Sequence, residues 1–146
     1  MRLSTRTQYG VRMMLALAKN YGRGYTYLKD IAQHEGMPEK YLSLIAIPLK
    51  GVGLLNATRG AKGGYALARP PGEITVKEIV EALEGKSGIV DCIKDLKSCP
   101  RIDQCATREV WVFLNGKISE VLASFTLEQL LSLNKDKALQ GFMPGL

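Results

Sequence analysis

The chain has 146 residues, 46% of them hydrophobic, which suits one ordinary domain or a small domain with an oligomerisation element. Its formal charge of +6 is uneven: residues 1–72 carry eleven Lys or Arg against three acidic residues, and residues 73–146 carry nine against eleven. A basic half favours nucleic acid or an anionic membrane as partner. The first residues lack the pattern of a signal peptide, and the apolar run MMLALA is too short to span a bilayer. We therefore expect a cytoplasmic protein without a membrane partner.

Two helices joined by a tight turn are expected in the basic half. A first helix begins at a Ser4 or Thr5 cap and runs to about Asn20. A second covers 28–34 and stops at Gly36, after which the turn HEGMP leads directly into another helix. This pattern is typical of a helix-turn-helix.

The next helix, EKYLSLIAIPLKGVG, is the expected recognition helix. Pro48 removes a backbone hydrogen bond in its second half, which predicts a kink or an early end. Lys40 and Ser43 lie on its polar face, and Tyr41 suits core packing and base contact equally. We assign three apolar side chains of this helix to the core: Leu44, Ile45 and Ile47.

A β-hairpin with a basic tip is predicted after this helix. Two short β-like runs, 54–58 and 65–68, flank a turn with three glycines, Arg59 and Lys62. A helix-turn-helix followed by such a hairpin is a winged helix, whose third helix enters the major groove while the wing reaches the backbone or a minor groove.

All three cysteines of the chain fall in the stretch CIKDLKSCPRIDQC, as Cys92, Cys99 and Cys105. A capping box of Thr75 and Glu78 starts a helix shortly before this stretch. The stretch has no helical or strand periodicity, so it is expected to be a loop that wraps around a bound group. Three thiols are one short of the usual ligand set of zinc or an iron-sulfur cluster, and from spacing alone zinc, a cluster and redox-active thiols all remain open.

A helix with apolar residues at intervals of three and four follows the cysteines. This is heptad spacing and suits pairing with another helix, although a monomer using the stripe as its own core stays open. A capping box of Thr126 and Gln129 starts a last helix. The stripe consists of Trp111, Leu114, Ile118, Val121 and Phe125.

The stretches MRLSTRTQYG, EKYLSLIAIPLKGVGLL and RGAKGGYALAR resemble the Rrf2 family of bacterial winged-helix repressors, and the cysteine loop before a Trp-bearing helix resembles its iron-sulfur, IscR-like branch. The resemblance implies a mainly α fold with a small β-hairpin wing and a long dimerisation helix. It implies a homodimer on a near-palindromic double-stranded DNA operator, with binding set by an iron-sulfur cluster. We divide the chain into a DNA-binding part, 1–72, and a part, 73–146, that holds the cluster-binding loop (91–106) and the dimerisation helices.

The resemblance also implies site residues. Tyr41 and Ser43 would face bases, and Arg59 would enter a minor groove. The residues expected to contact DNA are Ser4, Thr5, Arg6, Lys40, Tyr41, Ser43, Arg59, Gly60 and Lys62. Many relatives carry polar side chains directly after the Tyr-Leu pair. This chain has Ser43 and Leu44 there, so its base readout is expected to differ.

The sequence differs from the family at the positions that supply the fourth ligand of a cluster. Arg108 occupies the position of a ligating histidine and cannot ligate, and Gln8 replaces a carboxylate. His34, the single histidine, is the remaining candidate, against a plain surface histidine at a helix end. Asp91, Asp103, Glu109 or a small external ligand are further alternatives. Three thiols favour a 2Fe-2S cluster, and 4Fe-4S is the alternative.

The sequence contains no paired carboxylates, nucleophile-base set or phosphate-binding glycine motif, so we expect no enzyme. The expected function is a DNA-binding transcriptional regulator, a repressor, that senses iron-sulfur status, redox or nitric oxide. One alternative is the same scaffold with zinc or free thiols, sensing thiol redox or cysteine metabolism. A lesser alternative is an iron-sulfur carrier without a DNA role, which would need neither wing nor recognition helix.

Overall fold

The computed structural model describes residues 2–60, 63–85 and 88–140. The helices are α1 (Thr5–Lys19), α2 (Leu28–Glu35), α3 (Glu39–Gly51), α4 (Val76–Glu84), α5 (Asp91–Lys94), α6 (Ala106–Ser124) and α7 (Leu127–Gln140), with 3₁₀ turns η1 (Pro71–Glu73) and η2 (Ile102–Gln104). Strands β1 (Leu55–Ala57) and β2 (Tyr65–Leu67) form a two-stranded antiparallel sheet. The mainly α fold with a hairpin wing is therefore confirmed.

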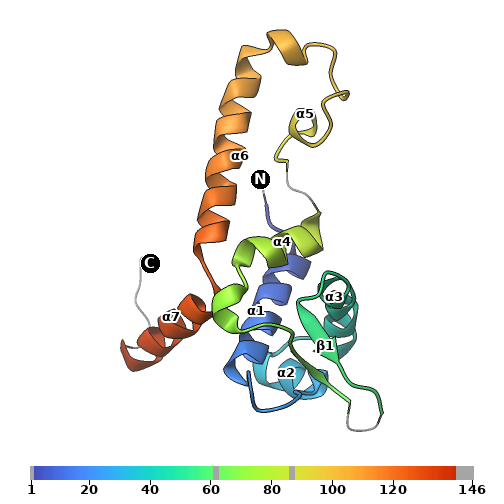
Figure 1. The fold of residues 1–146 in the computed structure, drawn as a ribbon, viewed down its shortest axis with the longest axis vertical. Coiled ribbons are helices and arrows are strands. Elements are labelled where there is room, and N and C mark those ends of the chain that lie inside the picture. Colours follow the sequence, from blue (N-terminus) through green and yellow to red (C-terminus); the bar gives the residue numbers. More distant parts are fainter. Residues whose placement is uncertain (1, 61–62, 86–87, 141–146) are drawn as a thin grey trace.

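The molecule is elongated, and its two ends differ. Helices α1 to α3 and the hairpin gather at one end, α6 extends away from them, and α5 lies beside the far part of α6 (Figure 1). Helix α4 connects these regions, since it packs against both α1 and α6. The cysteine stretch thus lies at the opposite end of the molecule from the wing.

The expected helix-turn-helix forms with its predicted caps. Ser4 caps α1 by accepting a hydrogen bond from the backbone N–H of Thr7. Gly36 ends α2 in the left-handed region, at φ 66°, which a glycine adopts without strain. Pro38, the last residue of the turn HEGMP, is the N-cap of α3, and its missing N–H costs nothing there.

Helix α3 corrects two expectations. It runs through Pro48 and ends only at Gly51, so the early end does not occur. Leu44 and Ile47 are 60% and 64% exposed and do not belong to the core, whereas Ile45 is fully buried. Residues 44 and 47 are three apart and share one helix face, and residue 45 lies on another. The assignment by residue type was wrong because two faces of α3 carry aliphatic side chains, and only the face with Leu42, Ile45 and Leu49 packs into the core.

One hydrophobic core joins both halves of the sequence. Ile74 and Ile79, which flank the start of α4, and Leu127 of α7 are fully buried among side chains of α1, α3 and the hairpin. The Thr75–Glu78 capping box is present, and Thr126 and Gln129 exchange the matching bonds at α7. The buried side chains of this core with no measurable exposure are Met13, Met14, Leu42, Ile45, Ala46, Leu49, Ile74, Ile79 and Leu127.

The wing is short but tied down at its base. Its register pairs Leu55 with Leu67 and Ala57 with Tyr65, and Tyr65 also forms an antiparallel bridge to Thr26. A Cβ on Gly64 would lie 2.7 Å from the carbonyl oxygen of Thr26, so only glycine allows this approach. The hairpin is therefore fixed to the segment that precedes α2.

Helix α6 has no fully buried residue in its 19 residues. No helix of the described residues is long and apolar enough to cross a membrane.

Candidate nucleic-acid interface and cysteine loop

The outward face of α3 carries exposed side chains at helical spacing: Glu39, Lys40, Ser43, Leu44, Ile47 and Lys50. The hydroxyl of Ser43 donates to the backbone oxygen of Glu39 at 3.0 Å, within its own helix. Charged side chains therefore lie at the two ends of this face, with Glu39 and Lys40 at its start and Lys50 at its end. Its centre, with Leu44 and Ile47, is aliphatic.

Tyr41 lies at the border between this face and the core. It is half-buried, and its ring meets that of Tyr9 edge-on, with 5.6 Å between the centroids. The guanidinium of Arg12 lies 5.9 Å from the centroid of Tyr9 and also pairs with Glu35 of α2 at 3.1 Å. The ring of Tyr41 thus braces α3 against α1, and its contact with a base stays a prediction.

The wing presents Arg59 and Gly60 to solvent at its tip. Gly60 has φ 100°, which turns the chain sharply after Arg59, and its carbonyl accepts from the N–H of Gly63 at 2.9 Å. Lys62, the other predicted cation of the tip, lies outside the described residues.

An open hollow of about 690 Å³ separates the wing from the beginnings of α2 and α3. Lys29 lines it from the first turn of α2, where backbone N–H groups point outward. Lys29 was not singled out from the sequence, although a cation in the first turn of the helix that precedes the tight turn could have drawn attention to it. The acidic Asp30 and Glu39 line the same hollow, so its charge is mixed.

The predicted phosphate-contacting residues at the start of α1 have different surroundings. Thr5 and Arg6 are exposed, whereas Ser4 is tied to Glu84 at the end of α4. Glu84 Oε1 accepts from the hydroxyls of Ser4 and Thr7, both at 2.6 Å, and from the backbone N–H of Ser4 at 2.9 Å. These bonds hold the pKa of Glu84 below its usual range, and the two side-chain hydroxyls contribute most to the lowering. Glu84 therefore links the C-terminal end of α4 to the start of α1.

We expect Glu84→Gln to reduce the acid sensitivity of folding. Because the pKa of Glu84 is lowered in the folded chain, its contribution is complete above the ordinary carboxyl pKa and is lost as pH falls through the folded value. Chemical unfolding at a series of pH values should show a shallower acid-side decline for the variant. Ser4→Ala, which removes the cap, should cost about 1 kcal/mol at neutral pH. An unchanged acid-side slope would contradict the role of Glu84.

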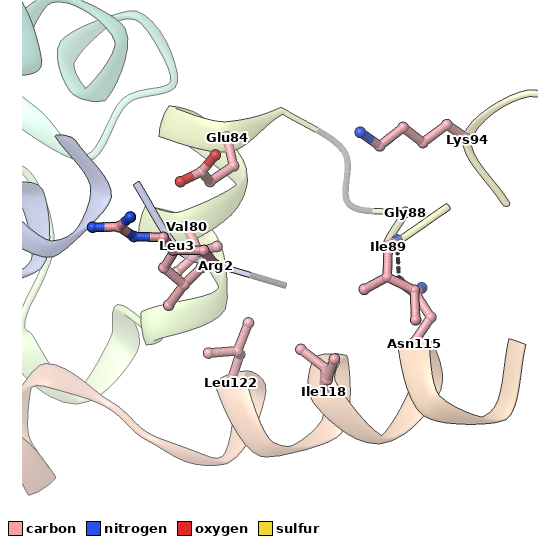
Figure 2. Close-up of a pocket in the computed structure, with 10 residues that line it drawn as sticks. All are labelled: Arg2, Leu3, Val80, Glu84, Gly88, Ile89, Lys94, Asn115, Ile118 and Leu122. Atoms are coloured by element: carbon pink, nitrogen blue, oxygen red, sulfur yellow. Dashed lines mark hydrogen bonds between the residues drawn. The ribbon is translucent and has the colours of Figure 1, made fainter. Parts of the chain in front are cut away.

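A pocket of about 410 Å³ connects this region to the cysteine loop (Figure 2). Ile118 and Leu122 point into it from α6, Glu84 reaches it from α4, and Lys94 reaches it from α5. The N–H of Ile89 donates to Asn115 Oδ1 at 3.3 Å, which anchors the beginning of the loop to α6. Arg2 and Leu3, just before α1, also line the pocket. The beginning of the cysteine loop and the residues that lead into α1 therefore line the same pocket.

The cysteine stretch is more structured than expected. Cys92 lies in α5, Cys99 lies before η2, and Cys105 is the N-cap of α6, so two short helical turns interrupt the predicted loop. All three thiols are free and half-buried. Within the described ranges, no three His, Cys, Asp or Glu side chains come together as a metal site. His34 is 79% exposed near Glu35 on α2, at the other end of the molecule (Figure 1).

Cys105 has the most polar surroundings described for a thiol of this chain. Its Sγ lies 3.1 Å from Thr107 Oγ1. The hydroxyl of Thr107 and the backbone N–H of Arg108 lower the pKa of the Cys105 thiol, as expected at a helix N-terminus. One turn into α6, the Nε of Arg108 is buried without a hydrogen-bond partner in the described structure.

These residues fit an iron-sulfur cluster in donor type and charge. Three free thiols on one segment are suitable soft ligands, and a thiolate-bound cluster is an anionic partner for the unpaired Nε of Arg108. The fit does not extend to a preformed cage, since the thiols are not gathered around one point.

The predicted dimerisation residues divide between two environments. Leu114 and Ile118 are half-buried, and Ile118 faces the pocket in the same chain. The exposed large apolar residues of α6 and its C-cap are Val110, Trp111, Val112, Phe113, Val121 and Phe125. Val110, Val112 and Phe113 are exposed as well, although they lie outside the predicted heptad stripe.

Comparison with known proteins identifies the scaffold. The family model Rrf2, described as an iron-dependent transcriptional regulator, matches residues 3–133. The HTH-type transcriptional regulator CymR of Bacillus subtilis (strain 168) is 40% identical over 132 residues, which cover 90% of this chain and 91% of that protein. The structure of CymR, the global cysteine regulator of B. subtilis, has a TM-score of 0.76 at 39% identity and covers 91% of this chain and 98% of that one. The structure of T. potens IscR has a TM-score of 0.74 at 35% identity, covering 99% and 94%.

These relatives are transcriptional regulators and not enzymes. Their likeness spans the helix-turn-helix, the wing and α6 rather than one motif. The chain is therefore a member of the Rrf2 family of winged-helix, DNA-binding transcriptional regulators.

Proposed function

We propose that this chain is a homodimeric repressor of a near-palindromic operator and that an iron-sulfur cluster, held by Cys92, Cys99 and Cys105, modulates its DNA binding. The single observation that carries the proposal is the position of the three thiols. They lie on a segment that is anchored to α6 and that shares the 410 Å³ pocket with the residues preceding α1.

The exposed apolar side chains of α6 support a homodimer. Phe113, Val121 and Phe125 are exposed on a helix without fully buried residues, an arrangement that a second copy would cover. A two-fold axis along such a helix pair would present two α3 helices to successive turns of DNA, so the crossing of the two α6 helices would set the half-site spacing.

Within each chain, Cys105 is where the cysteine segment meets α6. When bound, the cluster supplies a group whose loss or oxidation changes the charge and ligation at the thiols. The buried N–H of Arg108 could donate to that charge. Lys94 of the cysteine segment and Glu84 of α4 line the same pocket. Glu84 in turn holds Ser4 at the start of α1. His34 remains a candidate fourth ligand only as the His34 of a second copy, because its own chain keeps it at the opposite end (Figure 1).

Anaerobic purification tests this function directly. The protein should be brown, absorb visible light and give a paramagnetic-resonance signal when reduced. Its affinity for a duplex selected from a random pool, or its footprint on that duplex, should change when the cluster is removed by chelation.

A variant with all three cysteines changed to serine provides the control. It should be colourless, and its DNA binding should not respond to the same chelation. A wild-type protein that binds a cluster yet shows identical affinity and footprint with and without it would rule out the regulatory role.

A thiol sensor is the second candidate. The three free, half-buried thiols without a closed cage favour it, as does the similarity to a protein described as a global cysteine regulator. In this case hydrogen peroxide would take two electrons and two protons from two thiols, giving one disulfide and two water molecules. A colourless, metal-free protein whose DNA affinity changes with peroxide and returns with dithiothreitol would support this candidate over the cluster.

A further inference from the structure

The exposed face of α3 combines a cation with aliphatic side chains. Lys40, Ser43, Leu44 and Ile47 follow the i, i+3, i+4, i+7 spacing of one helix face, and all four are exposed. The opposite face, with Leu42, Ile45 and Leu49, is fully buried. The orientation of the helix is therefore fixed by its core side, and the aliphatic pair on the outside is not needed for packing.

Hydrogen-bonded base readout has few candidates on this face. The hydroxyl of Ser43 already donates to Glu39 O at 3.0 Å. Lys40 is a point charge without an acceptor, and no amide or carboxylate side chain lies between residues 40 and 47. The exposed carboxylate of Glu39 stands at the start of the helix and lines the hollow beside the wing. The amide and carboxylate side chains that read adenine or cytosine through paired bonds are therefore missing from its centre.

We infer that Leu44 and Ile47 are specificity-determining residues that read the C5-methyl groups of thymine in the major groove. The thymine methyl is the one apolar group that a base edge presents there, and aliphatic side chains recognise it by contact. The same side chains would cover the polar edge of a G·C pair and leave its hydrogen-bonding groups without partners, which is unfavourable. The pair thus selects for thymine and against G·C at the bases that it meets.

The surrounding charges support DNA as the occupant of this face. The segment 1–72 carries eleven Lys or Arg against three acidic residues. Lys40 begins the face, Lys50 is exposed near its end, and Arg59 is exposed at the wing tip. An aliphatic patch bordered by cations matches thymine methyls between two phosphate backbones better than it matches an apolar protein surface.

This inference rests on the proposed function as a sequence-specific DNA-binding protein. The test starts from a duplex enriched by the full-length protein from a random pool. Each thymine is then replaced in turn by uracil, which lacks the methyl group and keeps the same hydrogen-bonding edge. At the thymines in contact, wild-type binding should weaken by about fourfold per methyl, the value expected for one buried methyl group.

Leu44→Ser and Ile47→Ser provide the matched variants. Each should lose the uracil effect at the thymine that it contacts, so that thymine and uracil duplexes bind alike. Val52→Ser is the control, because Val52 is an exposed aliphatic residue that lies beside Glu78 and Glu81 of α4, away from this face. It should keep the full uracil effect.

The outcomes separate the inference from the function on which it rests. If no duplex is enriched, sequence-specific binding fails and the inference fails with it. If a duplex is enriched but uracil weakens wild-type binding at no position, the methyl readout alone is overturned. The same holds if uracil weakens binding of both serine variants as much as that of the wild type. Thermal unfolding of the variants checks that they are folded.

Discussion

Arg59→Ala is expected to weaken binding to a selected operator by about 1–3 kcal/mol, or roughly fivefold to 150-fold. Arg59 is exposed at the wing tip, directly before the turn at Gly60. A guanidinium placed in a narrow minor groove loses water and meets an enhanced negative potential, so its removal costs more than the loss of a phosphate contact.

Binding measured by fluorescence anisotropy at several salt concentrations distinguishes these two roles. Insertion predicts a large loss for the operator and a small loss for a scrambled duplex. A phosphate contact predicts equal losses for both and a salt slope lower by about one unit. Lys135→Ala is a suitable control, since Lys135 is an exposed cation of α7. An effect of Arg59→Ala no larger than that of Lys135→Ala would exclude a contact of Arg59 with DNA.

The sequence predicted best the elements that depend on local chemistry. The Thr75–Glu78 capping box placed the start of α4 at Val76, and the helix begins there. Gly36 ended α2 as predicted, because its left-handed conformation is a property of one residue. The wing was predictable for the same reason, since its glycines allow both the tip and the close approach to Thr26.

Features that depend on long-range packing were less accessible. Leu44 and Ile47 were assigned to the core because they are aliphatic, and only the arrangement of α1, α3 and α4 shows that the core side of α3 is already filled. The hydrogen bonds of Glu84 with Ser4 and Thr7 join residues about eighty positions apart, and no local sequence motif predicts them. The predicted fourth ligand failed to join the thiols within one chain for a related reason, since the distance between α2 and α5 is set by the fold (Figure 1).

Two isoleucines of α3 provide a direct test of this division between core and surface. Ile45 is fully buried and Ile47 is 64% exposed, two residues further along the same helix. Ile45→Ala should lower the free energy of unfolding by about 2–5 kcal/mol, because it removes buried methyl groups and leaves a cavity. Ile47→Ala should change it by less than about 0.5 kcal/mol.

DNA binding should show the opposite pattern when it is measured under conditions in which both variants are folded. Ile45→Ala leaves the outward face of α3 intact, so the folded variant should bind a selected operator with nearly the affinity of the wild type. Ile47→Ala should reduce operator affinity while leaving the urea midpoint almost unchanged. If instead Ile47→Ala destabilises the fold as much as Ile45→Ala does, then Ile47 is a packing residue, the face of α3 that meets DNA has been misassigned, and the aliphatic readout of thymine cannot hold. Because the two variants remove the same atoms from the same helix, any difference between them reports the orientation of α3 rather than the chemistry of isoleucine.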